Sequence, residues 1–182
     1  MAFPIFETDR LNLVHITQRY KDAFFDIMSR DEVTQYYGSE SLSGPEEAGR
    51  IIDSFQLVYE SGRGMRWGIV WKENDQFIGT VGLNNLNSRS KKAEIGYELH
   101  PDYWGKGITK EAVSEILRYS FEERELFRMG AVTFPANEAS SSLLKKLGFV
   151  EEGRLRGYLY QKGESHDALI FSLLKPEWEK MR

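Results

Sequence analysis

The sequence predicts an α/β (α+β) fold in which a mixed, mostly antiparallel central sheet is flanked by helices. Short runs of alternating apolar residues indicate strands, and longer runs with apolar residues every three to four positions indicate amphipathic helices. No repeat, low-complexity tract or linker divides the 182 residues. We therefore expect a single domain over residues 1–182, a length that buries a full hydrophobic core.

The first half of the chain predicts one strand, two helices and a β-hairpin. The expected elements are a strand at 10–16, helices at 20–28 and 48–59, and hairpin strands at 67–71 and 77–83. Ser43 and Glu46 fit a capping box ahead of the second helix, with Pro45 in its first turn. A polar loop is expected at 84–92.

The second half of the chain predicts further strands and two helices. The expected elements are strands at 93–99, 129–134, 149–155 and 168–174, and helices at 107–123 and 139–147. Alternation along 93–99 divides its side chains between two faces of the sheet. One face carries Ala93, Ile95, Tyr97 and Leu99, and the other carries Glu94, Gly96 and Glu98.

Composition limits the chemistry. The formal net charge of −4 argues against general nucleic-acid binding and tolerates a cationic substrate such as an amine. The chain has no cysteine, which excludes disulfides, thiolate metal sites and a cysteine nucleophile. His15, His100 and His166 lie far apart in the sequence, so we expect no metal site. With no basic leader and no apolar run of membrane length, we expect a cytoplasmic protein without membrane association.

The stretch 97–109 carries the main functional signal. A strand ends there, and Gly105 and Gly107 precede an amphipathic helix. Free backbone N–H groups and the helix dipole favour an anion at such a point, and a pyrophosphate fits best. Glycines let a phosphate approach the backbone without a Cβ in the way. The Gly-x-x-x-x-Gly-Lys-Ser/Thr motif of a phosphate loop is absent, and a dinucleotide fingerprint would need a third glycine at position 110, which is a lysine.

Four segments, in order along the chain, are similar to one family. They are Glu7 to Leu13, Ile95 to Gly107, Asn137 to Phe149, and Glu151 to Gly153 with the strand that ends at Leu174. Together they resemble a GNAT-type acyl-CoA N-acyltransferase, close to the RimJ/RimL-like branch, over nearly the whole chain. The resemblance implies a GNAT-like fold that uses acetyl-CoA as the acyl donor and needs no metal.

The resemblance also implies a set of cofactor-binding residues. The loop of Trp104, Gly105, Lys106, Gly107, Ile108 and Thr109 would hold the CoA pyrophosphate through its backbone N–H groups. The free strand edge at Leu99 would pair with the pantetheine arm, which Asn137 would also contact. The family usually has Arg or Gln at the position of Trp104 and Gly or Ala at that of Thr109. Neither departure removes a backbone donor.

Glu98 is the candidate general base. Acetyl transfer requires an amine to lose a proton and attack a thioester, and a carboxylate at the end of this strand would accept that proton directly or through a water. The alternative is an ordinary exposed strand glutamate. Glu94, on the same face, is a weaker candidate. The N–H of Leu99 is a candidate donor to the tetrahedral oxyanion.

Ser140 is the candidate for stabilising the departing thiolate. Many GNAT enzymes use a tyrosine in the second cofactor segment, but Leu143 and Leu144 stand at the comparable positions here. The RimJ/RimL-like pattern suggests Ser140 instead, and the alternative is a helix-start serine without a chemical role. A hydroxyl need only hydrogen-bond the sulfur, because a thiolate is a tolerable leaving group near neutral pH.

The acceptor is the remaining question. Tyr36, Tyr37, Tyr158 and Tyr160 lie in segments that would either wall an acceptor pocket or simply pack. Adjacent strand residues point to opposite faces, so His166 and Asp167 do not form a dyad.

The resemblance favours direct acetyl transfer to a protein N-terminal amine, as on a ribosomal protein. The alternatives are a small amine (polyamine, aminoglycoside or amino acid derivative) and a non-catalytic CoA-binding sensor. A homodimer is compatible with the sequence.

Overall fold

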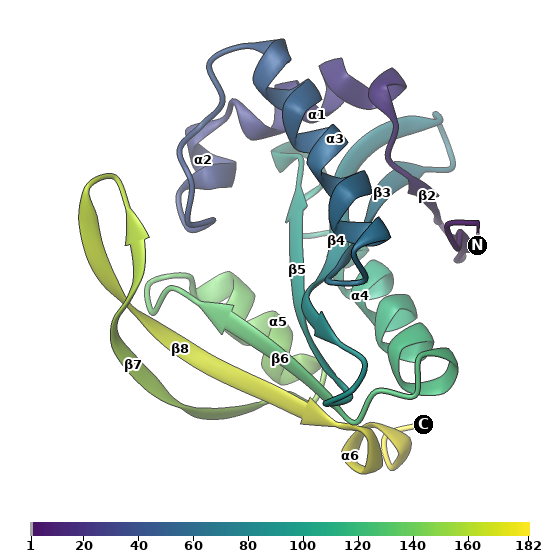
Figure 1. Ribbon diagram of the computed structural model, residues 1–182, viewed down its shortest axis with the longest axis vertical. Helices are drawn as coiled ribbons and strands as arrows, with labels where there is room; N and C mark the ends of the chain where they lie inside the picture. Colours follow the sequence, from purple (N-terminus) through teal and green to yellow (C-terminus); the bar gives the residue numbers. More distant parts are fainter. Residues whose placement is uncertain (1) are drawn as a thin grey trace.

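The computed structural model describes residues 2–182 and contains one eight-stranded sheet with the strand order β1-β2-β3-β4-β5-β6-β8-β7 (Figure 1). The strands are β1 (Phe6–Glu7), β2 (Leu11–His15), β3 (Met65–Trp71), β4 (Gln76–Asn87), β5 (Lys92–Leu99), β6 (Arg128–Thr133), β7 (Val150–Gln161) and β8 (Glu164–Leu174). Neighbouring strands are antiparallel except for β5 and β6, which are parallel. The predicted mixed, mostly antiparallel sheet is confirmed.

Helices cover both faces of this sheet. They are α1 (Lys21–Met28), α2 (Asp31–Thr34), α3 (Pro45–Glu60), α4 (Ile108–Arg118), α5 (Glu138–Lys146) and α6 (Lys175–Glu179). Neighbouring residues of β3 show the two layers, because side chains alternate along a strand. Ile69 packs with Ile116 of α4 in the main core, whereas Val70 packs with Phe24 of α1 and Ile52 of α3 in a second core. No helix among residues 2–182 is both long and apolar enough to cross a membrane.

The parallel pairing between β5 and β6 is short and leaves part of one edge of β5 unpaired. β5 pairs with β4 from Lys92 to Leu99, but its recorded partners in β6 end at Glu94, opposite Gly130. Beyond that point the two strands diverge, with α5 beside β6 (Figure 1). Residues 95–99 therefore have one backbone edge with no strand partner.

The predicted capping box before α3 is wrong. The helix begins at Pro45, so the N-cap is Gly44, which has no side chain to cap with. Ser43 lies one residue too early, and its hydroxyl donates to Glu47 Oε1 at 2.5 Å instead of accepting from a backbone N–H of the helix. The prediction that Pro45 occupies the first turn is confirmed.

Several predicted bounds also differ from the structure. The expected polar loop at 84–92 is partly wrong, because β4 continues to Asn87 through a register shift after Asn84. The helix predicted at 107–123 is α4 followed by a π-helical turn, η3 (Tyr119–Glu123). The closing strands extend beyond 149–155 and 168–174 into the long hairpin β7–β8. Most of β7 is exposed, and Gly153, Gly157 and Gly163 in and after it are typical of turns, so the sequence indicates only its first part as a strand.

Candidate active site

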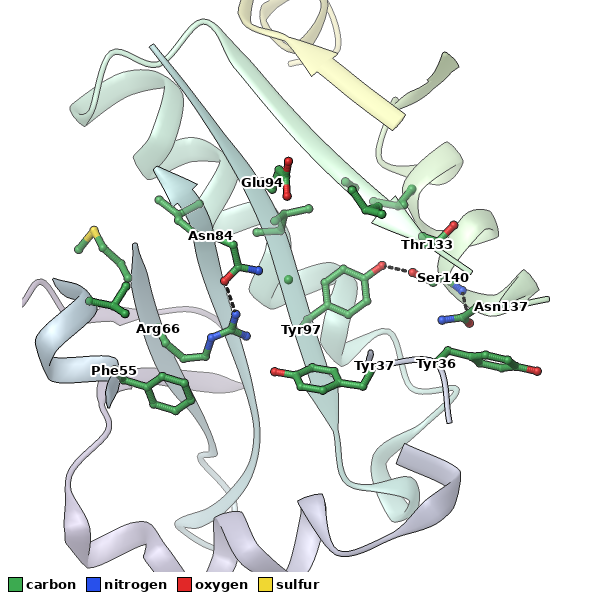
Figure 2. Close-up of a pocket in the computed structure, with 18 of the residues that line it drawn as sticks. Tyr36, Tyr37, Phe55, Arg66, Asn84, Glu94, Tyr97, Thr133, Asn137 and Ser140 are labelled. Atoms are coloured by element: carbon green, nitrogen blue, oxygen red, sulfur yellow. Dashed lines mark hydrogen bonds between the residues drawn. The ribbon is translucent and has the colours of Figure 1, made fainter. Parts of the chain in front are cut away.

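A cavity of about 450 Å³ lies where β5 and β6 part. Its walls come from the loop before α3, from β3 and β4, from the open edge of β5, and from β6 and α5 (Figure 2). The polar side chains around it include those of Tyr37, Arg66, Asn84, Tyr97, Asn137 and Ser140. A strand edge with unpaired backbone groups beside a polar cavity can accept an extended chain of amide groups as a further strand.

The loop that contains Gly105 and Gly107 leads into α4. Both glycines have a backbone conformation that glycine adopts with little strain. Gly105 has φ +72° and Gly107, the N-cap of α4, has φ +74°. A Cβ on Gly105 would meet no atom within 4 Å, so the space over the loop is open. The backbone of Gly105 is therefore open to the approach of an anion near the N-terminus of α4.

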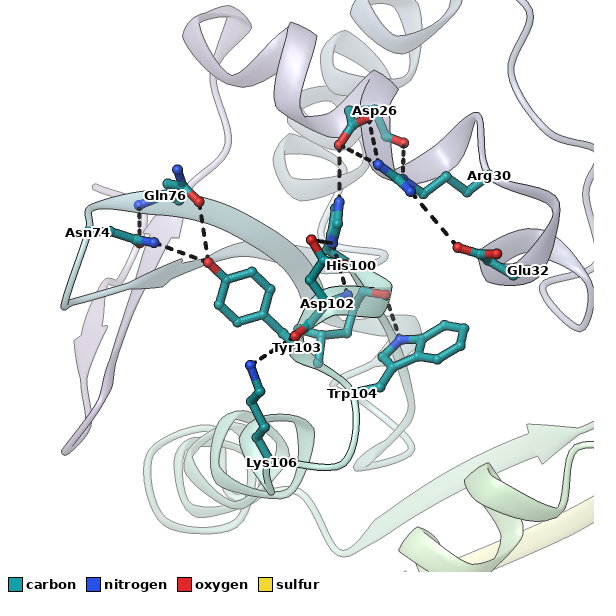
Figure 3. Close-up of polar contacts among 11 residues, drawn as sticks. Asp26, Arg30, Glu32, Asn74, Gln76, His100, Asp102, Tyr103, Trp104 and Lys106 are labelled. Carbon is teal, nitrogen blue, oxygen red and sulfur yellow. Dashed lines mark hydrogen bonds and ion pairs between the residues drawn. The ribbon is translucent and has the colours of Figure 1, made fainter.

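The side chains of Arg10 and Lys106 hold this loop in place. Arg10 Nη1 donates to the carbonyl of Lys106 at 2.9 Å, and Arg10 Nε pairs with Glu111 Oε2 of α4 at 2.7 Å. Lys106 Nζ donates to the carbonyl of Asp102 at 2.9 Å and lies 5.1 Å from the centre of the Tyr103 ring (Figure 3). The lysine is thus turned toward the preceding 3₁₀ turn.

Leu99 and Trp104 precede the two glycines, and Ile108 and Thr109 begin α4. Trp104 is half exposed, and its Nε1 donates to the carbonyl of Leu99 at 2.8 Å (Figure 3). That carbonyl therefore already has a partner, whereas sequence reasoning expected the whole edge at Leu99 to be free. Ile108 is buried against the core, so only its backbone faces outward. Thr109 follows it in the first turn of α4.

Glu98 is not an exposed strand glutamate, and that alternative is wrong. The residue is only 5% exposed, and it accepts a hydrogen bond from the Thr80 hydroxyl. Arg66 Nη1 lies 3.7 Å from Glu98 Oε2, an oxygen that has no hydrogen-bond partner within residues 2–182. Burial raises the pKa of Glu98, and the nearby Arg66, Thr80 and Tyr37 only partly oppose this effect.

Arg66 is a site residue that sequence reasoning missed. It is 7% exposed and lines the cavity, where its Nη2 donates to Asn84 Oδ1 at 2.8 Å (Figure 2). Gly96 makes this arrangement possible, since a Cβ there would lie 2.7 Å from Asn84 Nδ2 and 3.2 Å from Arg66 Nη2. The available signal was a charged residue inside the otherwise apolar strand β3.

Tyr97 is the second missed residue. It lies on the face of β5 that also carries Ala93, Ile95 and Leu99, and its hydroxyl is 2.6 Å from Ser140 Oγ in the cavity wall (Figure 2). Ser140 lies in the first turn of α5, and its backbone N–H donates to Asn137 Oδ1, the N-cap, at 3.2 Å. The structure thus brings together the two predicted residues of the second cofactor segment, and adds Tyr97 to them.

The four candidate tyrosines divide into two pairs. Tyr36 and Tyr37 line the cavity. Tyr158 and Tyr160 on the β7–β8 hairpin are exposed and line neither this cavity nor the second hollow beside it. Leu144 is buried in the core with Leu143 packed against it, so α5 offers no phenol at these positions.

A second hollow adjoins the first. Tyr36 lines both, and the second is bounded by Phe134, His166 and Asp167 among others. The rings of Tyr36, Phe134 and His166 follow one another with centroids 6.0 Å and 5.5 Å apart. Asp167 pairs with Arg154 rather than with His166, so the prediction that these neighbours form no dyad is confirmed.

The chain is similar to acetyltransferases in sequence and in structure. A family model described as an acetyltransferase (GNAT) domain matches residues 10–150. The uncharacterized N-acetyltransferase YoaA of Bacillus subtilis is 45% identical over 174 residues, which is 96% of this chain and 98% of that protein. The [ribosomal protein uS5]-alanine N-acetyltransferase of Escherichia coli is 29% identical over 94% of this chain and 91% of its own length.

Among solved structures, spermidine N-acetyltransferase from Vibrio cholerae in complex with CoA and spermine superposes with a TM-score of 0.82 at 20% identity. The match covers 94% of this chain and 99% of that one, and it shows that the two share a fold.

Proposed function

This chain belongs to the GNAT acetyltransferase family, and we propose that it transfers acetyl directly from acetyl-CoA to the N-terminal amine of a protein, as the RimJ/RimL-like branch does on ribosomal proteins. The use of acetyl-CoA as the donor is supported mainly by the early end of the pairing between β5 and β6, which leaves a free strand edge. The choice of a protein N-terminus as the acceptor is supported mainly by the two adjoining hollows, which share Tyr36 as a lining residue. We further propose that residues 1–182 act as one domain, because strands from both halves of the chain share one sheet.

On the donor side, the residues present fit CoA. The positive φ of Gly105 and Gly107, with open space over the loop, suits a pyrophosphate at the N-terminus of α4. The open edge of β5 would pair with the amides of the pantetheine arm. Asn137 Oδ1 caps α5, while its amide nitrogen has no acceptor within residues 2–182 and is free to donate to that arm.

On the acceptor side, charge and shape favour a peptide. The cavity contains the buried cation Arg66, which disfavours a polycation but suits an amine that is followed by a peptide carbonyl. From Tyr36 the second hollow continues along Phe134 and His166, giving later residues of a peptide a surface to lie on. A small amine remains the alternative acceptor, and the carboxylate of Glu94 in the cavity wall would attract it.

We assign the role of general base to Glu98. Its raised pKa brings its proton affinity closer to that of the amine it must serve, and the Thr80–Arg66 pair keeps the carboxylate in one place. Because Glu98 is buried, the proton would reach it through a water or through the Tyr37 hydroxyl rather than by direct contact with the amine.

The decisive experiment compares acceptors. The protein is mixed with acetyl-CoA and, separately, with peptides of varied N-termini, polyamines, aminoglycosides and amino acid derivatives, while free thiol and product mass are followed. A matched peptide whose N-terminus is blocked but which keeps its lysines separates α-amine from ε-amine transfer.

We expect thiol release with open N-termini and none with the blocked peptide. Turnover confined to small amines would overturn the peptide acceptor. Binding of acetyl-CoA without thiol release over the whole panel would instead identify a CoA-binding sensor.

A further inference from the structure

Ser140 is held at two points. Its backbone N–H donates to Asn137 Oδ1 at 3.2 Å, and its hydroxyl lies 2.6 Å from the hydroxyl of Tyr97. Tyr97 reaches it from β5, on the opposite wall of the parting between β5 and β6 (Figure 2). The hydroxyl pair therefore joins the two walls of the cavity, 43 residues apart in sequence, at the predicted site of the thioester.

The chemistry of the two groups sets the direction of their hydrogen bond. Burial raises the pKa of Tyr97 to about 12, so the phenol keeps its proton at neutral pH and can donate it. A serine hydroxyl accepts with its lone pairs and donates one proton of its own. Within residues 2–182 the Ser140 hydroxyl has Tyr97 as its hydrogen-bond partner and no other. With Tyr97 donating, the Ser140 proton is free to point into the cavity.

We propose that Tyr97 is a positioning residue, whose phenol donates to Ser140 Oγ so that the Ser140 hydroxyl faces the sulfur of the departing CoA. This inference rests on the proposed function. As the tetrahedral species collapses, the C–S bond breaks and its electron pair stays on sulfur, where the Ser140 O–H hydrogen bond stabilises the thiolate. The amine proton passes to Glu98, and the thiolate later takes a proton from water.

The hydrogen bond from Tyr97 to Ser140 offers a substitute for the tyrosine that α5 lacks. Leu144 lines the cavity and Leu143 packs against the core, so these positions of the helix offer no phenol. Tyr97 supplies one from the neighbouring strand, and it acts on the sulfur through Ser140 rather than by contact. The same hydrogen bond could also serve merely to clamp β5 to α5, and the experiment must separate these two roles.

The test uses Tyr97→Phe, Ser140→Ala and the double variant, with Tyr119→Phe and Ser141→Ala as matched controls. Tyr119 is a buried tyrosine whose hydroxyl contacts Met65 Sδ in the core, and Ser141 is the next serine of α5. Three quantities are measured: kcat, the Kd for acetyl-CoA, and the pKa of the thiol of bound CoA, which is followed by thiolate absorbance.

We expect Tyr97→Phe to lower kcat about tenfold with Kd within about twofold, since one hydrogen bond to a developing charge is lost. The double variant should be no slower than Ser140→Ala, because the two residues act as one unit. The pKa of the bound thiol should rise by about one unit in both single variants and remain unchanged in the controls.

Losses that multiply in the double variant, or an unchanged pKa of the bound thiol in Tyr97→Phe, would overturn the proposal. A mere clamp would lower the melting temperature and weaken CoA binding without moving that pKa. Failure of the proposed function is separate, since it appears as a wild-type protein that releases no thiol with any amine, while the titration of bound CoA still decides the role of Tyr97.

Discussion

The guanidinium of Arg66 lies 3.7 Å from the carboxylate of Glu98, and both side chains are buried beside the cavity where β5 and β6 part. Thr80 bridges them, because its hydroxyl accepts from Arg66 Nη1 at 3.2 Å and donates to Glu98 Oε1. A buried pair of this kind is sensitive to the removal of either partner, since the remaining charge is left without compensation.

Replacing Arg66 by leucine should destabilise the protein by about 3 kcal/mol at neutral pH, because Glu98 then remains buried without its counterion. The pKa of Glu98 is already raised above 4.5 in the folded state, so its ionisation costs stability as pH rises through the folded value. The deficit of Arg66→Leu should therefore be largest near pH 8 and shrink toward pH 5. Urea unfolding across this range measures it. A deficit independent of pH would contradict the assignment, and adding Glu98→Leu should recover most of the loss.

Glu98→Gln should lower kcat about a hundredfold, within the range for loss of a general base. A base acts only when ionised, so wild-type kcat/KM should rise as pH passes through the raised pKa of Glu98, and the variant should lose this rise. Initial rates from pH 5 to 9 measure it, with Glu94→Gln as the control carboxylate on the same strand face. An identical pH profile in Glu98→Gln would remove this residue from the mechanism.

Gly96→Ala should disturb the acceptor side more than the donor side. The new methyl would lie 2.7 Å from Asn84 Nδ2 and 3.2 Å from Arg66 Nη2, so both side chains must shift. We expect a loss of stability of about 1–3 kcal/mol from overpacking, and a larger rise in KM for the acceptor than for acetyl-CoA. Adding Asn84→Ala should restore stability but not the acceptor KM. Equal rises in both KM values would contradict the placement of the acceptor.

Gly107→Asp should weaken acetyl-CoA binding at least about tenfold, because a carboxylate at the N-cap of α4 would repel a pyrophosphate there. Gly107→Asn is the matched control, since it has the same shape, tolerates the left-handed φ of +74° and carries no charge. Calorimetric titration with CoA gives both constants. Equal affinities in the two variants would show that the anion does not bind at this loop.

Glu111→Gln should destabilise the contact between the start of β2 and α4. Burial raises the pKa of Glu111, but hydrogen bonds from Thr8 and Arg10 outweigh it, and the folded pKa is lowered from 4.5. The contribution, about 1 kcal/mol after screening by solvent, is therefore present above pH 4.5 and lost as pH falls through the folded value. Denaturation of wild type and variant from pH 7 into the acid range should show a difference in stability that shrinks as pH falls below 4.5. Glu115→Gln, on the same helix, should produce a smaller gap at pH 7.

Local sequence patterns were sufficient for most of the fold. Apolar periodicity identified the hairpin β3–β4, the strand β5 and the helices α3 to α5, because each pattern depends on residues close together in the chain. The glycines at 105 and 107 were recognisable for the same reason, since a positive φ next to a helix start is a local property. The outer part of β7 was missed because Gly157 and Gly163 are typical of turns.

The partners of the site residues depended on long-range geometry. Ser140 meets Tyr97, and Glu98 meets Arg66, only because of the register of the sheet and the point at which β5 leaves β6. Alternation alone placed Tyr97 and Glu98 on opposite faces of the strand, and it left open whether Glu98 was a base or an exposed glutamate. Alternation tells which side of a strand a residue faces, but not what lies on that side; that depends on how the strands and helices pack together.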